Sequence, residues 1–109
     1  MKTKSAKAKG RKLQDWVRDL MRAVRGGDDE EIQCAIMGEK GADVKLTGES
    51  RVYFNWDIEC KNREDFKGIY KYYSQAEAHG EGKPVLFIKS NKRKPLVIVD
   101  AEDFIKGKI

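Results

Sequence analysis

The sequence predicts a single α/β domain in which one mixed β-sheet is flanked by helices. Its 109 residues leave room for one compact core. Apolar side chains recur at helical spacing in some segments and at strand spacing in others. Two apolar runs near the C-terminal end are typical of buried strands. These patterns predict the order α, β, β, β, α, β, β, α, with residues 10–109 forming the domain and residues 1–9 a flexible basic tail.

The first half of the chain is expected to contain one helix and three strands. The helix begins after Gly10 and ends at Gly26, because apolar residues between them recur at helical spacing. Short strands follow at residues 32–37 and 42–46, joined by a glycine-containing turn. A longer strand covers residues 52–61. Its core face carries Val52, Phe54, Trp56, Ile58 and Cys60.

The second half is expected to contain a long helix, two strands and a short helix. The long helix covers residues 64–79 and ends at a glycine-rich turn. Residues 85–88 and 96–99 form the two buried strands, and the basic segment between them forms a hairpin loop. Residues 101–105 form a short closing helix.

Positive charge is concentrated at the N-terminal end. Residues 1–25 contain nine basic and two acidic side chains, whereas the rest of the chain has a net charge of −2. A second basic cluster occupies residues 89–94. Two such clusters indicate a polyanionic partner, with nucleic acid favoured, although a solubilising N-terminal tail would explain the first cluster equally well.

Compartment and cysteine chemistry follow from what the sequence lacks. No apolar run approaches the roughly 20 residues of a membrane-spanning helix, and no apolar stretch follows the N-terminal lysines. We therefore expect a cytoplasmic protein. Cys34 and Cys60 have no second Cys or His at metal-ligand spacing, so neither a zinc site nor a disulfide framework is predicted.

Charged residues on two neighbouring predicted strands form the candidate site. Glu59 and Lys61 are two positions apart and project from one face of their strand. Registers that keep the apolar faces together place Asp43 on the same face, opposite or diagonal to Asp57 or Glu59. Carboxylates about 4 Å apart repel by about 4 kcal/mol at an effective dielectric near 20, so they require a cation.

The chemistry predicted for this group is metal-assisted phosphodiester hydrolysis. Carboxylate oxygens suit Mg²⁺ or Mn²⁺, which keep several of their waters when bound. Lys61 can hold or deprotonate an attacking water, or stabilise charge on a phosphate. A second interpretation stays open, because an E-x-K pattern alone is typical of an ordinary solvated strand face.

Five short motifs of the chain resemble those of the PD-(D/E)XK nuclease superfamily, and in particular its small phage-type Holliday junction resolvases. The motifs are KGRKLQ at residues 9–14, MGEKGAD at 37–43, IECKN at 58–62, QAE at 75–77 and KPV at 83–85. The resemblance implies a core of helix, three antiparallel strands, helix and strand. It also implies a metal-dependent endonuclease of DNA recombination that acts in the host cytoplasm if it is encoded by a phage.

Residue roles carry over from the resemblance. It implies that Asp43 and Glu59 bind the metal, that the Cys60 carbonyl completes the metal site, and that Lys61 is catalytic. Gln75 resembles a glutamine that several branches use near the site. Two departures from the family pattern occur. Gln14 stands at the place of a helix-one glutamate, and Ala42 replaces the signature proline.

The candidate DNA contacts are basic or amide side chains expected near the metal face. They are Lys9, Arg11, Lys12, Gln14, Asn62, Arg63, Lys92 and Arg93. Each could equally be an ordinary solvated side chain. We expect a homodimer, because cutting two opposed strands of branched DNA requires two active sites. A nicking or restriction-type nuclease and a noncatalytic basic nucleic-acid-binding module are the alternatives.

Overall fold

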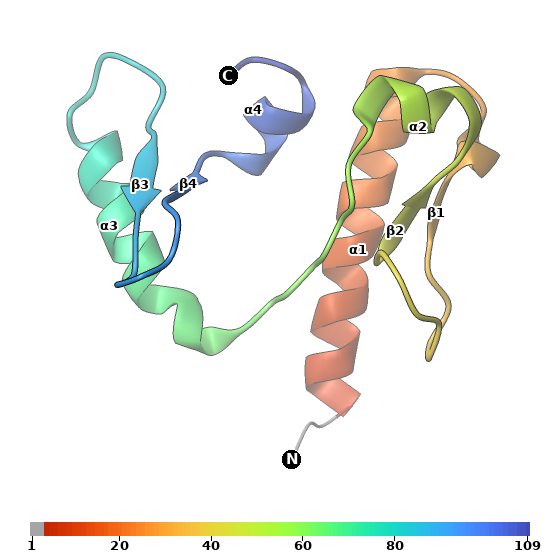
Figure 1. Ribbon diagram of the computed structural model, residues 1–109, viewed down its shortest axis with the longest axis horizontal. Coiled ribbons are helices and arrows are strands. Elements are labelled where there is room, and N and C mark those ends of the chain that lie inside the picture. Colours follow the sequence, from red (N-terminus) through yellow and green to blue (C-terminus); the bar gives the residue numbers. More distant parts are fainter. Residues whose placement is uncertain (1–3) are drawn as a thin grey trace. The chain divides into compact units, whose positions relative to one another are not determined.

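The computed structural model describes residues 4–109, with side chains from Lys7 onward. This part of the chain forms a small mixed α/β protein with four α-helices and two antiparallel two-stranded sheets (Figure 1). The expectation of a single mixed central sheet is therefore wrong. The chain divides into two compact units, and the boundary falls between Arg63 and Glu64. Each unit is described by itself.

The first unit contains a long helix beside a small sheet. Helix α1 (Lys4–Arg25) leads through a short 3₁₀ helix, η1 (Asp29–Glu31), into strand β1 (Ile32–Cys34). Strand β2 (Val44–Leu46) pairs with β1 in antiparallel register. Helix α1 contacts both strands, and Figure 1 shows it running alongside them. Both strands occur where they were expected, but each is shorter than the sequence predicts.

The core of this unit joins α1 to the sheet. The buried side chains are Met21 of α1, Ile32 of β1 and Val44 of β2, with Phe54 farther along the chain. A polar contact supports the same packing, because Arg22 Nε donates a hydrogen bond of 2.9 Å to the Ile32 carbonyl. The apolar stripe of α1 is thus held in place by both packing and a hydrogen bond.

Helix α1 begins before the position predicted for it. The tail predicted at residues 1–9 has its first three residues outside the described part of the chain, and the helix already includes Lys4. Lysine and alanine favour helix, and Gly10 costs only about 1 kcal/mol relative to alanine inside one. Gly10 therefore lies within the helix and does not mark its start.

The largest correction concerns the strand predicted at residues 52–61. Residues Gly48–Phe54 form a helix, α2, which ends at Asn55 in the left-handed conformation with φ of 50°. Of the remaining segment, only Ile58 makes a bridge to Val44. The residues predicted to share one apolar core face are consequently not all buried, because Phe54 is 6% exposed and Val52 is 82% exposed.

The side chain of Glu31 explains why α2 forms. Its carboxylate accepts hydrogen bonds from the backbone N–H groups of Glu49 and Ser50, at 3.3 and 3.0 Å. It also accepts a bond of 2.9 Å from the Ser50 hydroxyl, and Ser50 is fully buried. A carboxylate at this end of a helix satisfies free N–H groups and complements the helix dipole. Residues 48–54 are therefore helical, although the alternation from residue 52 onward predicts a strand.

The second unit follows the predicted order more closely. A 3₁₀ turn, η2 (Glu64–Phe66), leads into helix α3 (Lys67–Glu77). Strands β3 (Leu86–Ile88) and β4 (Leu96–Ile98) form an antiparallel hairpin. Helix α4 (Ala101–Ile105) occupies the residues predicted for it.

Local signals account for the agreement in this unit. Asp100 precedes α4, and its carboxylate accepts a hydrogen bond of 2.9 Å from the Asp103 N–H, as a helix N-cap does. In the hairpin loop the Arg93 N–H donates to the Ser90 carbonyl, and Lys92 has a φ of 62°. The prediction of a hairpin with a basic loop is therefore confirmed.

The two strands of this hairpin are not buried, contrary to the prediction. Phe87 and Val97 lie opposite each other in the register and are 74% and 50% exposed. The reason is the size of the sheet. Helix α3 contacts β3, and in the described part of the chain no third strand extends the pair.

We predict that Gly48→Ala destabilises the protein by more than the strain of its backbone alone. Gly48 has a φ of 57°, where an L side chain costs about 1–2 kcal/mol, and an added Cβ would collide with the Glu31 carboxylate. Urea denaturation should show this loss. Gly10→Ala is the matched control, because Gly10 is helical with open space around it, and it should stabilise by about 1 kcal/mol. Equal stability of the two variants would contradict the prediction.

Candidate functional site

Asp43 lies at the centre of the candidate site because its backbone joins two segments. Its N–H donates to the Ile58 carbonyl at 2.7 Å, and its carbonyl accepts from the Ala35 N–H at 2.9 Å. Its side chain is also held, since Oδ2 accepts a hydrogen bond of 2.7 Å from the Cys60 N–H. Asp43 is thus fixed against the segment that carries Glu59, Cys60 and Lys61.

The register is one of those that the sequence allows for these residues. Val44 is paired with Ile58, so Asp43 lies across from Glu59 on the adjoining segment. Asp57, the other carboxylate considered, forms an ion pair of 3.1 Å with Arg51 instead. The structure therefore brings Asp43 toward Glu59 and leaves Asp57 elsewhere.

Glu59 and Lys61 form an ion pair at the surface. Lys61 Nζ lies 3.2 Å from Glu59 Oε2, and the side chains are 53% and 64% exposed, respectively. Exposed pairs of this kind contribute little to stability, typically about 0.2–1 kcal/mol. Both side chains are therefore available to another partner.

The pKa of the Cys60 thiol reflects both its burial and the negative charges around it. Burial raises its pKa to about 11, and the charges of Asp43, Cys34 and Glu59 act in the same direction. The thiol therefore stays protonated at neutral pH and is a poor metal ligand, because metals bind the thiolate. Only the backbone of Cys60 is suited to the role predicted for this residue.

The oxygen donors match magnesium better than a metal bound entirely by side chains. Among residues 4–109 no group of three or more His, Cys, Asp or Glu side chains is arranged to hold a metal. Mg²⁺ requires less, because it is commonly bound by one or two carboxylates together with waters and substrate phosphate. Asp43, Glu59 and the Cys60 carbonyl could supply such a set. We expect Asp43 to contribute Oδ1, because Oδ2 already accepts the Cys60 hydrogen bond.

A groove connects Asp43 with the N-terminal part of α1. It encloses about 560 Å³ and is lined by side chains of α1 and of the segment between β1 and β2. The charged or amide side chains around it are Lys7, Arg11, Gln14, Asp15, Glu39 and Asp43. Two of the predicted DNA contacts, Arg11 and Gln14, thus face the same space as the candidate metal ligand.

The other predicted residues lie outside this groove. Lys9 and Lys12 are exposed on α1, and Asn62 and Arg63 are exposed just after Lys61. Gln75 on α3 is exposed and belongs to the second unit.

Lys92 and Arg93 also belong to the second unit, where they form part of the hairpin loop. Arg93 borders a shallow hollow together with Lys89 and Lys94. The basic loop therefore presents several cations side by side.

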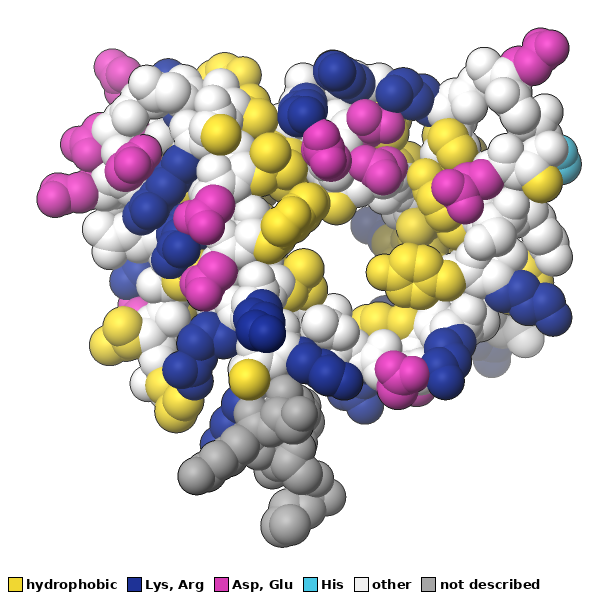
Figure 2. Space-filling view, turned by 180° about the vertical axis from the view of Figure 1, so that it is seen from behind, with side chains coloured by type: hydrophobic (Ala, Val, Ile, Leu, Met, Phe, Trp, Pro, Cys, Tyr) yellow, Lys and Arg dark blue, Asp and Glu magenta, His cyan; other side chains and the backbone are white. Residues whose placement is uncertain are grey.

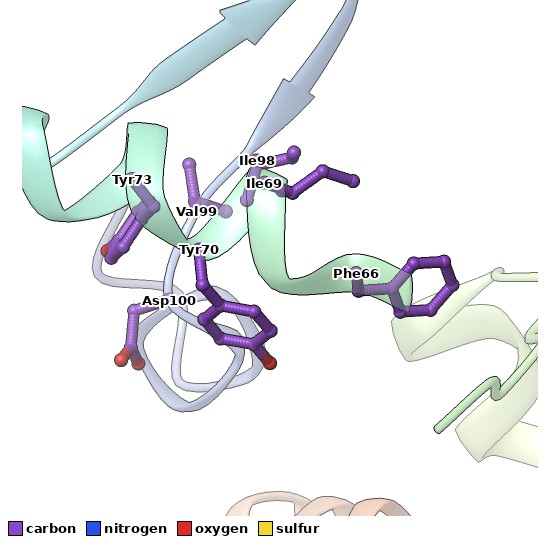
Figure 3. A pocket seen from close by; sticks show the side chains of 7 residues that line it. All are labelled: Phe66, Ile69, Tyr70, Tyr73, Ile98, Val99 and Asp100. Carbon is purple, nitrogen blue, oxygen red and sulfur yellow. The ribbon is translucent and has the colours of Figure 1, made fainter. Parts of the chain in front are cut away.

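The second unit contains a cavity of different character (Figure 3). It encloses about 320 Å³ between α3 and the segment after β4, and its lining is mainly aromatic and aliphatic. Figure 3 shows Tyr73 beside Asp100, and burial together with the charge of Asp100 raises the pKa of Tyr73. Asp100 already caps α4. No constellation of reactive groups lines this cavity, so the Asp43 groove is the better candidate.

Sequence reasoning misses two charged residues of the groove and misplaces a third. The sequence predicts that Lys7 belongs to the flexible basic tail, whereas Lys7 lies in α1, four residues before Arg11 and on the same face of the helix. Asp15 and Glu39 were not considered as site residues, and only the folding of the segment between β1 and β2 brings Glu39 to the groove.

Comparison with known proteins adds no assignment. No family model, curated protein or solved structure matches the chain. Within residues 4–109 no helix has the length and apolar character needed to cross a bilayer. The resemblance to PD-(D/E)XK nucleases therefore rests on the sequence motifs.

We predict that Asp43→Asn lowers the pKa of the Cys60 thiol, because it removes a negative charge that disfavours the thiolate. With Cys34 replaced by serine, alkylation of Cys60 below its pKa should then become several-fold faster, since the thiolate is the reactive form. Asp57→Asn is the matched control and should leave the rate unchanged, because Asp57 pairs with Arg51. If Cys34→Ser alone, Cys34→Ser with Asp43→Asn and Cys34→Ser with Asp57→Asn were alkylated at the same rate, the proximity of Asp43 and Cys60 would be contradicted.

Proposed function

We propose that this protein is a Mg²⁺-dependent DNA endonuclease of the PD-(D/E)XK kind that hydrolyses phosphodiester bonds in branched DNA. The observation that carries the proposal is the hydrogen bond from the Cys60 N–H to Asp43 Oδ2. It joins the aspartate of one family motif to the E-C-K segment of another, two motifs separated in sequence. A chance pair of charged strand residues would not require this contact.

Asp43, Glu59 and the Cys60 carbonyl are the groups that would hold the metal, and Mn²⁺ is expected to substitute for Mg²⁺. When bound, the metal supplies polarisation of the phosphate and a more acidic water. The Cys60 N–H keeps the Asp43 carboxylate in a fixed orientation. Glu59 is ion-paired and exposed, so its carboxylate can turn toward a cation at little energetic cost.

Lys61 supplies a mobile positive charge next to the carboxylates. Its ammonium group is 3.2 Å from Glu59 and more than half exposed. It can therefore leave this pair and donate hydrogen bonds to a phosphate oxygen or to the attacking water. Its role is to position the water and to stabilise negative charge that develops on the phosphate.

The DNA-binding surface is proposed to combine the α1 cations with residues near Lys61. Arg11 and Gln14 face the groove, and Asn62 and Arg63 directly follow Lys61. Lys9 and Lys12 are further phosphate contacts proposed in the first unit. In the second unit, Lys92 and Arg93 stay predicted phosphate contacts and Gln75 stays a predicted site residue.

Branched DNA is the proposed substrate because of the resemblance to junction resolvases. Such an enzyme cuts two opposed strands, so we propose a homodimer. A phage-encoded enzyme of this kind would act in the host cytoplasm. A nicking or restriction-type nuclease would use the same residues on another substrate.

A noncatalytic nucleic-acid-binding module is the alternative function. The absence of a three-ligand side-chain group in the described part of the chain favours it, as does the solvated Glu59–Lys61 pair. The two functions differ in one measurable property, which is cleavage that depends on a divalent cation.

We predict that Asp43→Ala and Glu59→Ala each reduce Mg²⁺-dependent cleavage by at least about a hundredfold, because each removes a metal ligand. Binding of DNA should persist or strengthen, since a carboxylate that repels phosphate is lost. The assay uses linear, forked and four-way DNA with and without Mg²⁺. Asp57→Ala is the control and should retain activity, because Asp57 pairs with Arg51 away from the site. Full activity of either site variant would refute the assignment, and no cleavage by the intact protein would favour the noncatalytic module.

We predict that Lys61→Ala lowers the cleavage rate by about 10²–10³ while leaving metal affinity within a few-fold of the intact protein, because Lys61 is not a ligand. Isothermal titration with Mn²⁺ and single-turnover cleavage would separate the two effects. Lys67→Ala is matched, since Lys67 forms a comparable exposed pair with Glu64 at 3.1 Å. A loss of metal affinity without a separate loss of cleavage rate would show that Lys61 supports metal binding and does not act on the phosphate or the water.

A further inference from the structure

We propose that Lys7 and Arg11 form a seat for one phosphate group of the DNA backbone, in the same groove as Asp43. The proposal rests on the proposed nuclease function and assigns Lys7 to the substrate-binding surface. The residues that would make the seat belong to one helix, α1, and point into one groove. The seat would hold the DNA backbone beside Asp43, the one proposed metal ligand that lines this groove.

Basic residues form a stripe along one side of α1, and their partners change along its length. Toward the C-terminal end of α1, the arginines form ion pairs or hydrogen bonds with other residues of the first unit. Arg18 pairs with Asp15 and Asp19 at 3.4 and 2.9 Å, and Arg22 donates to the Ile32 carbonyl. These cations stabilise the fold and are not free to bind an anion.

Lys7 and Arg11 continue this stripe but have no such partner. They are exposed, and among the described residues neither forms an ion pair or a side-chain hydrogen bond. Figure 2 shows Lys and Arg side chains gathered over the N-terminal part of α1. Within the described residues, the end of the stripe without ion-pair partners is therefore the end that lines the groove together with Asp43.

The charges around the groove leave an excess of cations. Asp15 is paired with Arg18, and Glu39 is paired with Lys45 at 2.5 Å. Asp43 is the remaining carboxylate of the lining, and the same groove is lined by Lys7 and Arg11, which form no ion pair with the described residues. The groove thus attracts an anion, and a divalent cation at Asp43 would strengthen that attraction.

The surface between the two cations is open to a ligand. Gly10 lies between them in sequence and lines the groove, and a Cβ built on it would have no neighbour within 4 Å. The planar guanidinium of Arg11 can bind two phosphate oxygens at once, while the ammonium of Lys7 acts as a point charge. This combination fits a phosphate, whose oxygens accept from both groups.

A phosphate in this seat and a cation at Asp43 are expected to favour each other. They carry opposite charge and share one groove, so each raises the affinity for the other by the same factor. Binding of the DNA backbone at Lys7 and Arg11 would thus promote loading of the metal. The α1 cations would act as positioning residues for cleavage.

The test is the salt dependence of DNA affinity for the full chain, measured by fluorescence anisotropy without divalent cations. Each phosphate contact contributes about 0.9 to the slope of log affinity against log salt, so Lys7→Ala with Arg11→Ala should lower the slope by about 1.8. Affinity at low salt should fall about tenfold. Alanine favours helix, so both changes keep α1 folded, which circular dichroism would verify.

The matched control is Lys67→Ala with Lys71→Ala, which removes the same charge from two exposed lysines of α3 that lie outside the groove. Its slope should fall by less than half as much. Addition of Ca²⁺, a cation that carboxylate oxygens also bind, should strengthen DNA binding more in the intact protein than in the Lys7/Arg11 variant.

The proposed phosphate seat would be refuted if the slope of log affinity against log salt were equal in the two double variants. It would also be refuted if the slope of the Lys7/Arg11 variant were unchanged from that of the intact protein. The nuclease proposal fails separately, through full cleavage by the Asp43 variant or no cleavage by the intact protein. A seat that fails while Asp43→Ala still abolishes cleavage would leave the proposed function standing.

Discussion

The carboxylate of Glu31 is the constraint on which the first unit depends. By accepting hydrogen bonds from Glu49 and Ser50 it makes residues 48–54 helical and leaves no room for a side chain at Gly48. The chain then returns from Asn55 and meets β2 only at Ile58. This single meeting point brings Cys60 to the side chain of Asp43, so a helix cap at one end of the sheet determines the geometry of the candidate site at the other.

Two kinds of charged residue cooperate in this unit. Arg22 holds α1 against β1 through its hydrogen bond to the Ile32 carbonyl, and Arg18 pairs with Asp15 inside the helix. Lys7 and Arg11 on the same side of the helix form no ion pair with any of the described residues. Because α1 is continuous, the contacts that anchor its C-terminal half also set the position of its N-terminal half. In the proposed function, one helix would therefore serve stability at its C-terminal end and ligand binding at its N-terminal end.

Sequence reasoning succeeded where the deciding signals are local. The cap at Asp100 and the turn at Ser90 lie next to the elements they define, so α4 and the β3–β4 hairpin were predicted. The proximity of Asp43 to residues 59–61 was predicted as well, because the alternation of side chains limits the possible registers. Sequence reasoning failed at residues 48–54, because their apolar residues fit either a strand or a helix. The side chain that caps the helix belongs to Glu31, which lies 18 positions before Glu49, so no local signal decides between the two.

The β3–β4 hairpin has a consequence for how the protein behaves at high concentration. It is short, both outer edges are unpaired within the described residues, and Phe87 and Val97 are exposed on one face. Such edges tend to pair with copies of themselves unless charge prevents it. Lys89, Lys92, Arg93 and Lys94 surround the turn of this hairpin, and their mutual repulsion opposes edge-to-edge association. The charges of the basic loop thus oppose association of this hairpin with copies of itself, whatever else the loop binds.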